Sequence, residues 1–489
     1  MLLTMILAAI LIGRGPALRS GQSATPGNYT GKLTSFLLAN SFREADKLAA
    51  QLLADPALAP TDMALCGLAV LKAGRIAEAE AIFSKALARS PAEPDAHLGL
   101  GRIASVRNDL NASISHLRQA VRSVSFYEEA LRRLWRSAWD RGRVDELLDI
   151  AKLAEERFGR ESKSLPSFFT NGLVQVKGLD GKWLFQMEGR FERIRVPLVA
   201  SASNPGIRMI SLALNGKGEY LFHLDSALAG FMTLSPLLAE ELGLTSSGSS
   251  TSTGVGTAAI GTRFAMLGSV KLGPVTFRNV PVMVSDIQTL RGLKEGLVGT
   301  AFLKRFNATI DVEAGIMDFL PLERPDLLED GIDRRVVAVE IPLFIFDQTV
   351  VEASMAGAPP ALYILDSAAA TNLVDAAFFE EYIRPKIDPA RIVQGGIRGA
   401  GGPQAVRRVD GLPIALGTLV FEKQQVHEFR MGPLNEIPGR YAAGLLGNPL
   451  LWPYRVHMDF KAGRLILEKY PGSTKAPDRA IGRTSAPVQ

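Results

Sequence analysis

Leu224-Asp225-Ser226-Ala227 recurs 141 residues later as Leu365-Asp366-Ser367-Ala368. Each copy ends an apolar, β-forming segment, and each is followed by a glycine-rich run and then by a short hydrophobic segment that ends in glycine. The same acidic residue in the same local setting indicates a duplicated domain. Two such halves can supply one carboxylate each to a shared acid–base site around a two-fold axis.

The correspondence extends on both sides of this motif. Asn215-Gly216-Lys217 begins ten residues before Asp225, and Ala356-Gly357-Ala358 begins ten residues before Asp366. Both triplets are typical of tight turns, so we expect a β-hairpin leading into each aspartate-bearing strand. The segments that end in glycine lie 148 residues apart, at Leu297-Val298-Gly299 and Leu445-Leu446-Gly447. We therefore predict two similar all-β lobes, over residues 191–325 and 335–470.

A short helix is expected after each aspartate. Ser235 can cap a helix that continues through Leu242, because Pro236 suits the first helical position. In the second half, Asp375 is expected to cap a helix over residues 376–383.

A glycine-rich run follows each aspartate, and Gly254 and Gly395 both lie 29 residues after the aspartate of their half. Glycine allows a hairpin to approach a bound chain closely and to move. The residues that we expect to contact substrate are Gly254, Val255, Gly256, Gly399, Ala400 and Gly401.

Taken together, these motifs resemble the pepsin and retropepsin clan over about residues 190–470, especially the bacterial retropepsin-like aspartyl peptidases. The resemblance implies that Asp225 and Asp366 form a catalytic dyad that shares one proton and activates water against a peptide bond, without a cofactor, a metal or a covalent intermediate. It implies flaps from both lobes over the substrate. Ser226 and Ser367 would hydrogen-bond between the lobes to support the dyad, and Gly299 and Gly447 would complete the ψ-shaped loops.

The chain departs from this family at one position in each lobe. Ala227 and Ala368 stand where the family usually has glycine, and a Cβ there could demand an unfavourable backbone angle or crowd the scissile bond. Both copies of the motif carry the same replacement of glycine by alanine, and both retain the aspartate and the serine. We predict an aspartic endopeptidase, and the alternative is a catalytically inactive scaffold that binds peptides or proteins in the same groove.

The first third of the chain contains a repeat with a period of 34 residues. Phe42, Ile76, Leu110 and Val144 keep this spacing, and so do Ala45, Ala79, Ser113 and Leu147. Small residues that recur every 34 residues, at positions where paired helices approach each other, indicate a helix-turn-helix solenoid. This pattern resembles tetratricopeptide repeats over residues 28–160. The concave face of such a solenoid could bind a protein partner or the substrate, or the helices could simply support the fold.

Three further segments complete the predicted organisation. Residues 1–25 contain an apolar run that is too short to span a bilayer and resembles an export signal, which predicts a periplasmic or extracellular location. Residues 161–190 are expected to form a linker with a β-hairpin around Asp180-Gly181. Residues 471–489, rich in Pro, Ser and Gly, are expected to be disordered. The chain is therefore predicted to be multidomain α+β, with an N-terminal α-solenoid and two tandem lobes in a pseudo-two-fold pair.

Composition narrows the possible partners. The formal net charge of +5 comes from 55 basic and 50 acidic residues without a dense basic block, which argues against nucleic acid. Cys66 is the single cysteine, and the five histidines show no paired metal-ligand spacing. His223 shares a strand face with Asp225 by period two, so it lies near the site or is a packed strand histidine.

Overall fold

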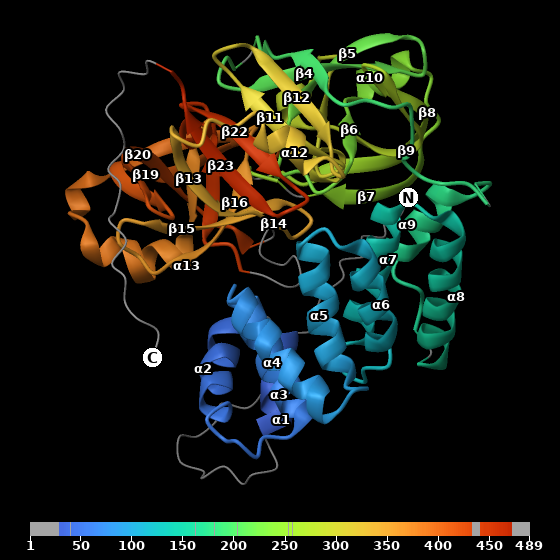
Figure 1. The fold of residues 1–489 in the computed structure, drawn as a ribbon, viewed down its shortest axis with the longest axis vertical. Coiled ribbons are helices and arrows are strands. Elements are labelled where there is room, and N and C mark those ends of the chain that lie inside the picture. Colours follow the sequence, from blue (N-terminus) through green and yellow to red (C-terminus); the bar gives the residue numbers. More distant parts are fainter. Residues whose placement is uncertain are drawn as a thin grey trace, which may run out of the picture.

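The computed structural model describes residues 29–471, except for residues 40, 162, 180, 203, 253 and 257 and residues 433–440. Helices come first and stand beneath a β-rich body in Figure 1. This arrangement confirms the predicted multidomain α+β class, with an N-terminal helical region joined to a β-rich body. The predicted export segment lies outside the described residues, and so do residues 472–489 of the predicted disordered tail.

Over residues 29–160, leaving out residue 40, eight helices form four consecutive pairs. The second helix of each pair begins at Phe42, Ile76, Leu110 or Val144, which confirms the 34-residue period. The pairs are α1 (Tyr29–Leu38) with α2 (Phe42–Leu52), α3 (Pro60–Lys72) with α4 (Ile76–Arg89), α5 (Pro94–Val106) with α6 (Leu110–Ala120), and α7 (Tyr127–Arg141) with α8 (Val144–Arg160). We call these eight helices the helical array.

Glycine allows the helices of the array to pack closely. A Cβ added to Gly67 would lie 2.5 Å from the ring of Phe83, and one added to Gly101 would lie 2.7 Å from the side chain of Leu117. Real Cβ atoms do not approach neighbours so closely, so a larger residue at either position would push two helices apart.

The predicted β-hairpin within residues 161–190 is wrong. Residues Ser167–Val176 form helix α9, whose buried residues Phe169, Gly172 and Val176 follow helical spacing. Gly172 packs against Trp135 of α7, where an added Cβ would lie 2.5 Å from the indole ring. Burial against the array therefore overrides the β propensity of this apolar run. Asp180, at the expected turn, lies outside the described residues.

Each lobe is built around its own sheet. The sheet of the first lobe contains β1 (Gln186–Glu188), β3 (Val199–Ala200), β4 (Arg208–Leu214), β5 (Gly218–Leu224), β6 (Met232–Leu234), β7 (Ser247–Ser252), β8 (Ile260–Leu272), β9 (Val275–Ser285) and β10 (Gly296–Val298). The sheet of the second lobe contains β14 (Phe344–Ile345), β15 (Thr349–Met355), β16 (Ala361–Asp366), β17 (Asn372–Asp375), β18 (Ile392–Gly399), β19 (Gly402–Leu416), β20 (Leu419–Phe429) and β21 (Gly444–Gly447).

A third sheet joins the lobes and displays their two-fold relation. Its order is β13-β23-β22-β11-β12-β2, with three strands from each half. At its centre, β11 and β22 run antiparallel with Thr309 opposite His457, so the pseudo-two-fold axis passes beside this pair. The strands are β2 (Ile194–Pro197), β11 (Phe306–Asp311), β12 (Ile316–Pro321), β13 (Val337–Pro342), β22 (Tyr454–Asp459) and β23 (Arg464–Lys469).

The hairpins predicted before the aspartates are present in both lobes. Asn215 and Gly216 connect β4 to β5 with φ of 50° and 66°, and Ala356 and Gly357 connect β15 to β16 with φ of 51° and 68°. Positive φ at both central residues is the conformation of a type I′ hairpin. Each turn therefore aims one strand at the site.

The predicted helices differ in how they begin. Ser235 caps α10 (Pro236–Glu241) as expected, by accepting a hydrogen bond from the Leu238 amide at 3.2 Å. The Asp375 cap is wrong, because that carboxylate accepts instead from the Met431 amide and from the Tyr441 hydroxyl, at 3.0 and 2.7 Å. The helix predicted over residues 376–383 is nevertheless present, as α13 (Ala376–Phe378) followed directly by a π-helical segment over Phe379–Ile383.

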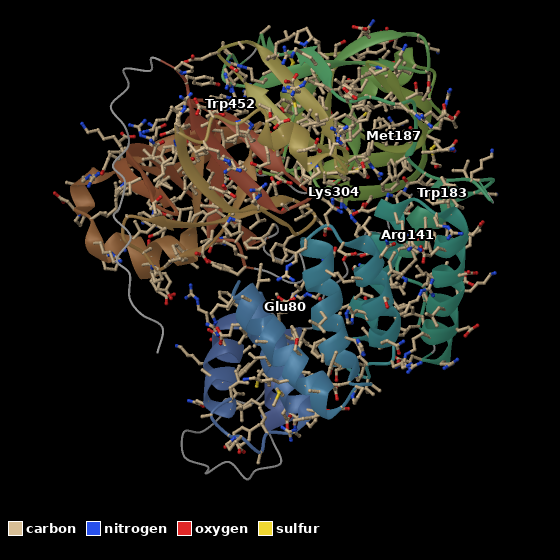
Figure 2. The ribbon with its side chains drawn as sticks, in the orientation of Figure 1. Glu80, Arg141, Trp183, Met187, Lys304 and Trp452 are labelled. Carbon is tan, nitrogen blue, oxygen red and sulfur yellow. The ribbon has the colours of Figure 1, made fainter. Side chains whose placement is uncertain are left out.

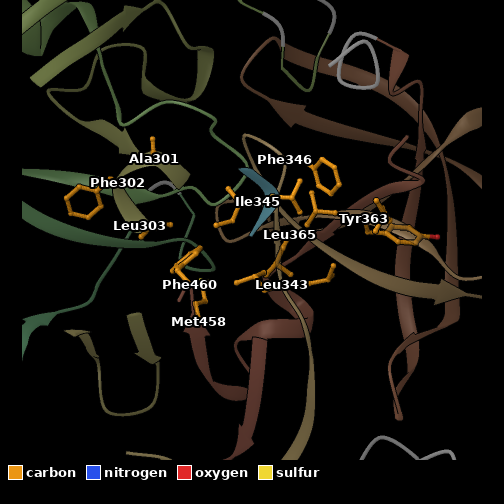
Figure 3. Packing of buried hydrophobic residues seen from close by; sticks show 14 of the residues in the cluster. Ala301, Phe302, Leu303, Leu343, Ile345, Phe346, Tyr363, Leu365, Met458 and Phe460 are labelled. Atoms are coloured by element: carbon orange, nitrogen blue, oxygen red, sulfur yellow. The ribbon is translucent and has the colours of Figure 1, made fainter. Parts of the chain in front are cut away.

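One cluster of buried apolar residues runs through the helices, both lobes and the shared sheet. Figure 3 shows part of it, with Leu303, Ile345 and Leu365 in the same buried group. Because the array and the lobes share this core, the helical region is not a separately packed module.

Candidate active site

The two aspartates lie at the ends of equivalent strands. In the first lobe β5 pairs in parallel with β10, and in the second β16 pairs in parallel with β21. The Asp225 amide donates to the Val298 carbonyl at 2.9 Å, and Asp366 lies opposite Gly447. The two parallel pairings place the aspartates at equivalent positions in their lobes.

Glycine is required where each ψ-shaped loop closes. A Cβ on Gly299 would lie 2.3 Å from the Gly230 carbonyl oxygen, and one on Gly447 would lie 2.3 Å from the Thr371 carbonyl oxygen. Glycine at each position therefore lets the backbone at the end of β10 or β21 pass close to the loop that follows the aspartate.

Ser226 and Ser367 exchange hydrogen bonds between the lobes. The Ser226 hydroxyl donates to the Leu365 carbonyl at 2.6 Å and accepts from the Ser367 amide at 3.0 Å. The reciprocal bonds run from the Ser367 hydroxyl to the Leu224 carbonyl at 2.7 Å and from the Ser226 amide to the Ser367 hydroxyl at 3.1 Å. Both hydroxyls are buried and satisfied, and each aspartate is thereby fixed to the opposite lobe.

Backbone amides orient the two carboxyl groups in the same way. Asp225 Oδ1 accepts from the amides of Ala227 and Leu228, at 3.0 and 2.9 Å, and Asp366 Oδ1 accepts from the Ala368 amide at 2.8 Å. In both lobes the alanine that follows the serine contributes its backbone amide. Alanine supplies this amide as well as glycine does.

The electrostatics of the site couple the two carboxyl groups. Burial raises the pKa of Asp225 to about 6. The pKa of Asp366 is raised well above its usual value, first by burial and then by the charge of Asp225. Two carboxyl groups that interact in this way are expected to hold one proton between them over a range of pH and to titrate as a pair.

Ala227 and Ala368 fit the backbone of their loops. Neither is among the described non-glycine residues with positive φ, so the conflict considered from the sequence does not arise. The methyl group of Ala227 packs against an apolar cluster of the second lobe that includes Ile364 and Val406.

The glycine-rich runs form two hairpins whose tips meet. Gly256 and Gly401 form an isolated parallel bridge. The Gly401 amide donates to the Val255 carbonyl at 2.8 Å, and the Ala258 amide donates to the Gly401 carbonyl at 3.0 Å. A Cβ on Gly256 would lie 2.3 Å from the Gly401 carbonyl carbon, and one on Gly399 would lie 2.5 Å from the Val255 oxygen. Both lobes therefore contribute a flap, and glycine is necessary where the flaps touch.

Each flap tip packs against the opposite lobe. Val255 of the first flap packs on the apolar cluster of the second lobe that contains Ile364. Ala400 of the second flap packs on a cluster of the first lobe formed by Ile260, Ile287, Leu290 and Leu297. Each flap therefore reaches across to the lobe opposite its own.

The two lobes differ in one side chain two residues before the aspartate. His223 of the first lobe is buried, its Nε2 lies 2.8 Å from Glu295 Oε2, and its charge lowers the pKa of Asp225. The equivalent residue in the second lobe is Ile364, which is fully buried among apolar side chains. Sequence reasoning placed His223 on the correct strand face but missed Glu295, whose position beside β5 depends on the parallel pairing of β10.

Two further findings concern membrane spans and metal ligands among the residues from 29 to 471 that the structure describes. No helix among them is long and apolar enough to cross a bilayer. No group of three or more His, Cys, Asp or Glu side chains among them is arranged to hold a metal ion.

Two segments of the chain match known families. Residues 210–302 match the family described as aspartyl protease, and residues 70–134 match a tetratricopeptide repeat family. The chain therefore combines a tetratricopeptide repeat region with an aspartyl-protease-like region. The second match covers helices of three of the four pairs, and the first covers Asp225 and Gly299, whose counterparts in the second lobe are Asp366 and Gly447.

Solved structures to which the chain is similar include an aspartic proteinase from Irpex lacteus, with 11% identity, a TM-score of 0.39, and coverage of 58% of this chain and 99% of that one. Conglutin gamma, a basic 7S globulin from lupine seeds, has 11% identity and a TM-score of 0.36, covering 57% and 96% of the two chains. No curated protein matches the sequence significantly.

Proposed function

We propose that this chain is an aspartic endopeptidase in which Asp225 and Asp366 activate water against a peptide bond. The reciprocal hydrogen bonds of Ser226 and Ser367 carry this proposal, because they tie the two aspartate loops together across the junction of the lobes. The raised pKa of both carboxyl groups supports it, since the reaction needs one ionised and one protonated member.

The reaction conserves protons within the dyad. The ionised carboxylate takes a proton from water as the water oxygen attacks the amide carbon, and the protonated carboxyl donates to the carbonyl oxygen. When the tetrahedral species collapses, the leaving nitrogen takes the first proton and the second returns from the hydroxyl of the intermediate. The carbon–nitrogen bond breaks, and the dyad again holds one proton.

The flaps indicate an extended polypeptide substrate. Their tips touch through backbone hydrogen bonds, so a substrate must separate them before it can lie between the flaps and the dyad. Apolar clusters under both tips favour a substrate with apolar side chains on either side of the scissile bond.

Turnover of a mixed peptide library between pH 3 and pH 8 tests this function. Asp225→Asn and Asp366→Asn should each abolish cleavage that the wild-type chain performs. Asp326→Asn is the matched control, because Asp326 is an exposed aspartate that pairs with Arg324 on the surface. Equal cleavage by the wild type and either dyad variant would contradict the proposal.

The alternative is a catalytically inactive scaffold that binds peptides in the same groove. The observation that favours it is the replacement of the family glycine by Ala227 and Ala368 in both lobes. Binding of library peptides by the wild-type chain without any cleavage over the same pH range would favour the scaffold.

We further propose that the helical array binds a protein partner or the substrate, and that the chain is exported. The repeat match supports the first proposal, and the apolar run before Arg14 supports the second. Cross-linking of substrates to the Asp225→Asn chain, with the linked residues mapped by mass spectrometry, tests the first. The compartment and N-terminal mass of the native protein test the second.

A further inference from the structure

One edge of the helical array contacts the lobes through the turns between paired helices. The Tyr441 amide donates to the Lys72 carbonyl at 3.2 Å, the Asn108 side chain donates to the Lys304 carbonyl at 3.1 Å, and the Leu184 amide donates to the Gly142 carbonyl at 2.7 Å. In Figure 2, Lys304 lies where the helices meet the first lobe. Within this edge, helix α7 (Tyr127–Arg141) has three links toward the Asp225 loop.

The first link from α7 is direct. Arg136 Nη2 donates to the Ala229 carbonyl at 2.6 Å, four residues after Asp225. Ala229 lies between Leu228, whose amide binds the Asp225 carboxylate, and Gly230, whose carbonyl faces Gly299. Arg136 therefore holds the same loop that orients the carboxylate.

The second link passes through a loop of the second lobe. Asp347 lies 3.3 Å from Arg136 and 3.8 Å from Arg133. The next two residues then contact the dyad loop: Gln348 Nε2 donates to the Ala227 carbonyl at 2.6 Å, and the Thr349 amide and hydroxyl donate to the Ser226 carbonyl at 3.0 and 2.8 Å. Asp347 has φ of 67°, so the loop holds a backbone conformation that most residues avoid.

The third link is a buried ion pair. Asp140 of α7 lies 2.6 Å from Lys304 Nζ, both side chains are buried, and the Asp140 carbonyl accepts from Arg305 at 2.9 Å. Lys304 ends helix α11 (Thr300–Leu303), and the Thr300 hydroxyl donates to the Ser226 carbonyl at 2.8 Å. Helix α7 is thus connected to the Asp225 loop through both segments that pack against it.

The second lobe holds its own dyad loop differently. Asn448 and Trp452, the counterparts of Thr300 and Lys304, donate to the Gly206 carbonyl at 2.8 and 2.7 Å. Gly206 belongs to the loop that corresponds by two-fold symmetry to the one containing Asp347. In the second lobe, the residues that hold this loop therefore come from the lobes themselves. In the first lobe, side chains of α7 take the equivalent place.

We infer that Arg136 is a positioning residue of the peptidase, through which helix α7 holds the Asp225 loop in its working geometry. The inference rests on the proposed function and extends it: the helical array is part of the catalytic unit, and it acts on one half of the dyad. Loss of the Arg136 hydrogen bond would leave the Ala229 carbonyl unpaired and release the loop, and a small displacement of a catalytic group lowers turnover steeply.

Steady-state kinetics with three α7 variants tests this role. Arg136→Gln should lower kcat by about 10- to 100-fold with KM changed less than about threefold, and Arg136→Lys should restore part of the loss because it keeps the charge and one donor. The matched control is Arg132→Gln, one turn earlier on the same helix, where the side chain pairs with Glu128 on the surface. An unchanged kcat in Arg136→Gln, or an equal loss in Arg132→Gln, would overturn the inference.

Hydrogen exchange separates this inference from the proposed function. In Arg136→Gln, backbone amides over residues 226–231 should exchange faster, whereas those over residues 367–372 should exchange as in the wild type. This difference is expected even if the wild-type chain cleaves no peptide. Equal exchange in the first segment of variant and wild type would overturn the inference whatever the activity.

Discussion

At the scale of single residues, the site depends on two carboxyl groups and two hydroxyl groups, with one of each kind from each half of the chain. Burial and the charge of Asp225 raise the pKa of Asp366, and Ser226 and Ser367 exchange hydrogen bonds across the axis. The first lobe differs from the second at His223, which stands where Ile364 stands in the other half.

Replacing His223 by leucine should move the pH dependence of the dyad. The charge of His223 lowers the pKa of Asp225, so its removal should raise that pKa further above its ordinary value. Activity needs one ionised carboxylate, and the acidic limb of the kcat/KM profile should therefore shift to higher pH. The double change His223→Leu with Glu295→Ala, which leaves no unpaired carboxylate, should shift in the same direction. A shift to lower pH in both variants would contradict this account.

Ser226→Ala should destabilise the junction of the lobes. The change removes one of two donors to the Leu365 carbonyl, which keeps the Thr349 hydroxyl, and it removes the hydroxyl that accepts from the Ser367 amide. Leaving that buried amide unpaired costs about 1–3 kcal/mol. Urea denaturation measures the loss. Ser84→Ala is the control, because that exposed hydroxyl donates only to a carbonyl of its own helix. Equal urea midpoints for the two variants would show that the hydrogen bonds exchanged between the lobes do not contribute to stability.

At the scale of elements, the flap tips and helix α9 show how neighbours decide local structure. The tips need glycine because each meets the backbone of the other, and α9 is helical because its apolar face meets Trp135. Neither contact is visible within the segment itself.

Gly256→Ala should impair the first flap. Gly256 has φ of 126°, and its Cβ would collide with Gly401, so the tips would be forced apart or the first hairpin would rearrange. We expect kcat/KM to fall by about 10- to 100-fold, as for other displacements of substrate-positioning groups. Gly261→Ala is the matched control in the same hairpin, because no heavy atom lies within 4 Å of the Cβ it would add. Similar kcat/KM values for the two variants would contradict the proposed contact.

The sequence predicted those elements whose signal is local or repeated. The 34-residue period located the second helices of the array, and the duplicated motif located both aspartates, both flaps and both ψ-shaped loops. Prediction from the sequence failed where a residue distant in the chain decides the local structure. Residues 167–176 have β propensity but bury a helical face, and Asp375 binds Met431 and Tyr441 instead of capping a helix. The links from Arg136 and the pairing of Glu295 with His223 likewise required the fold.

At the scale of the whole molecule, the array and the lobes form one structural unit. A single apolar cluster runs through both, and the buried pair of Asp140 and Lys304 lies at their contact. Breaking a buried ion pair by removing one member costs about 3–5 kcal/mol because a charge is left buried without its partner.

Asp140→Leu should therefore destabilise the helices and the first lobe together. Hydrogen exchange followed through urea unfolding should show array peptides and first-lobe peptides unfolding at one common midpoint, lower than in the wild type. Asp149→Leu, a change at an exposed aspartate of the array, is the control. Loss of stability confined to the array would indicate that the two parts fold independently.

The central claim is that the carboxyl groups of Asp225 and Asp366 lie side by side and share a proton. Titration of ¹³C-labelled aspartate carboxyl groups by NMR measures this without any substrate. The pKa of Asp366 is raised partly by the charge of Asp225, so Asp225→Asn should lower it toward its ordinary value. A pKa of Asp366 that is the same in the wild type and in Asp225→Asn would contradict the dyad.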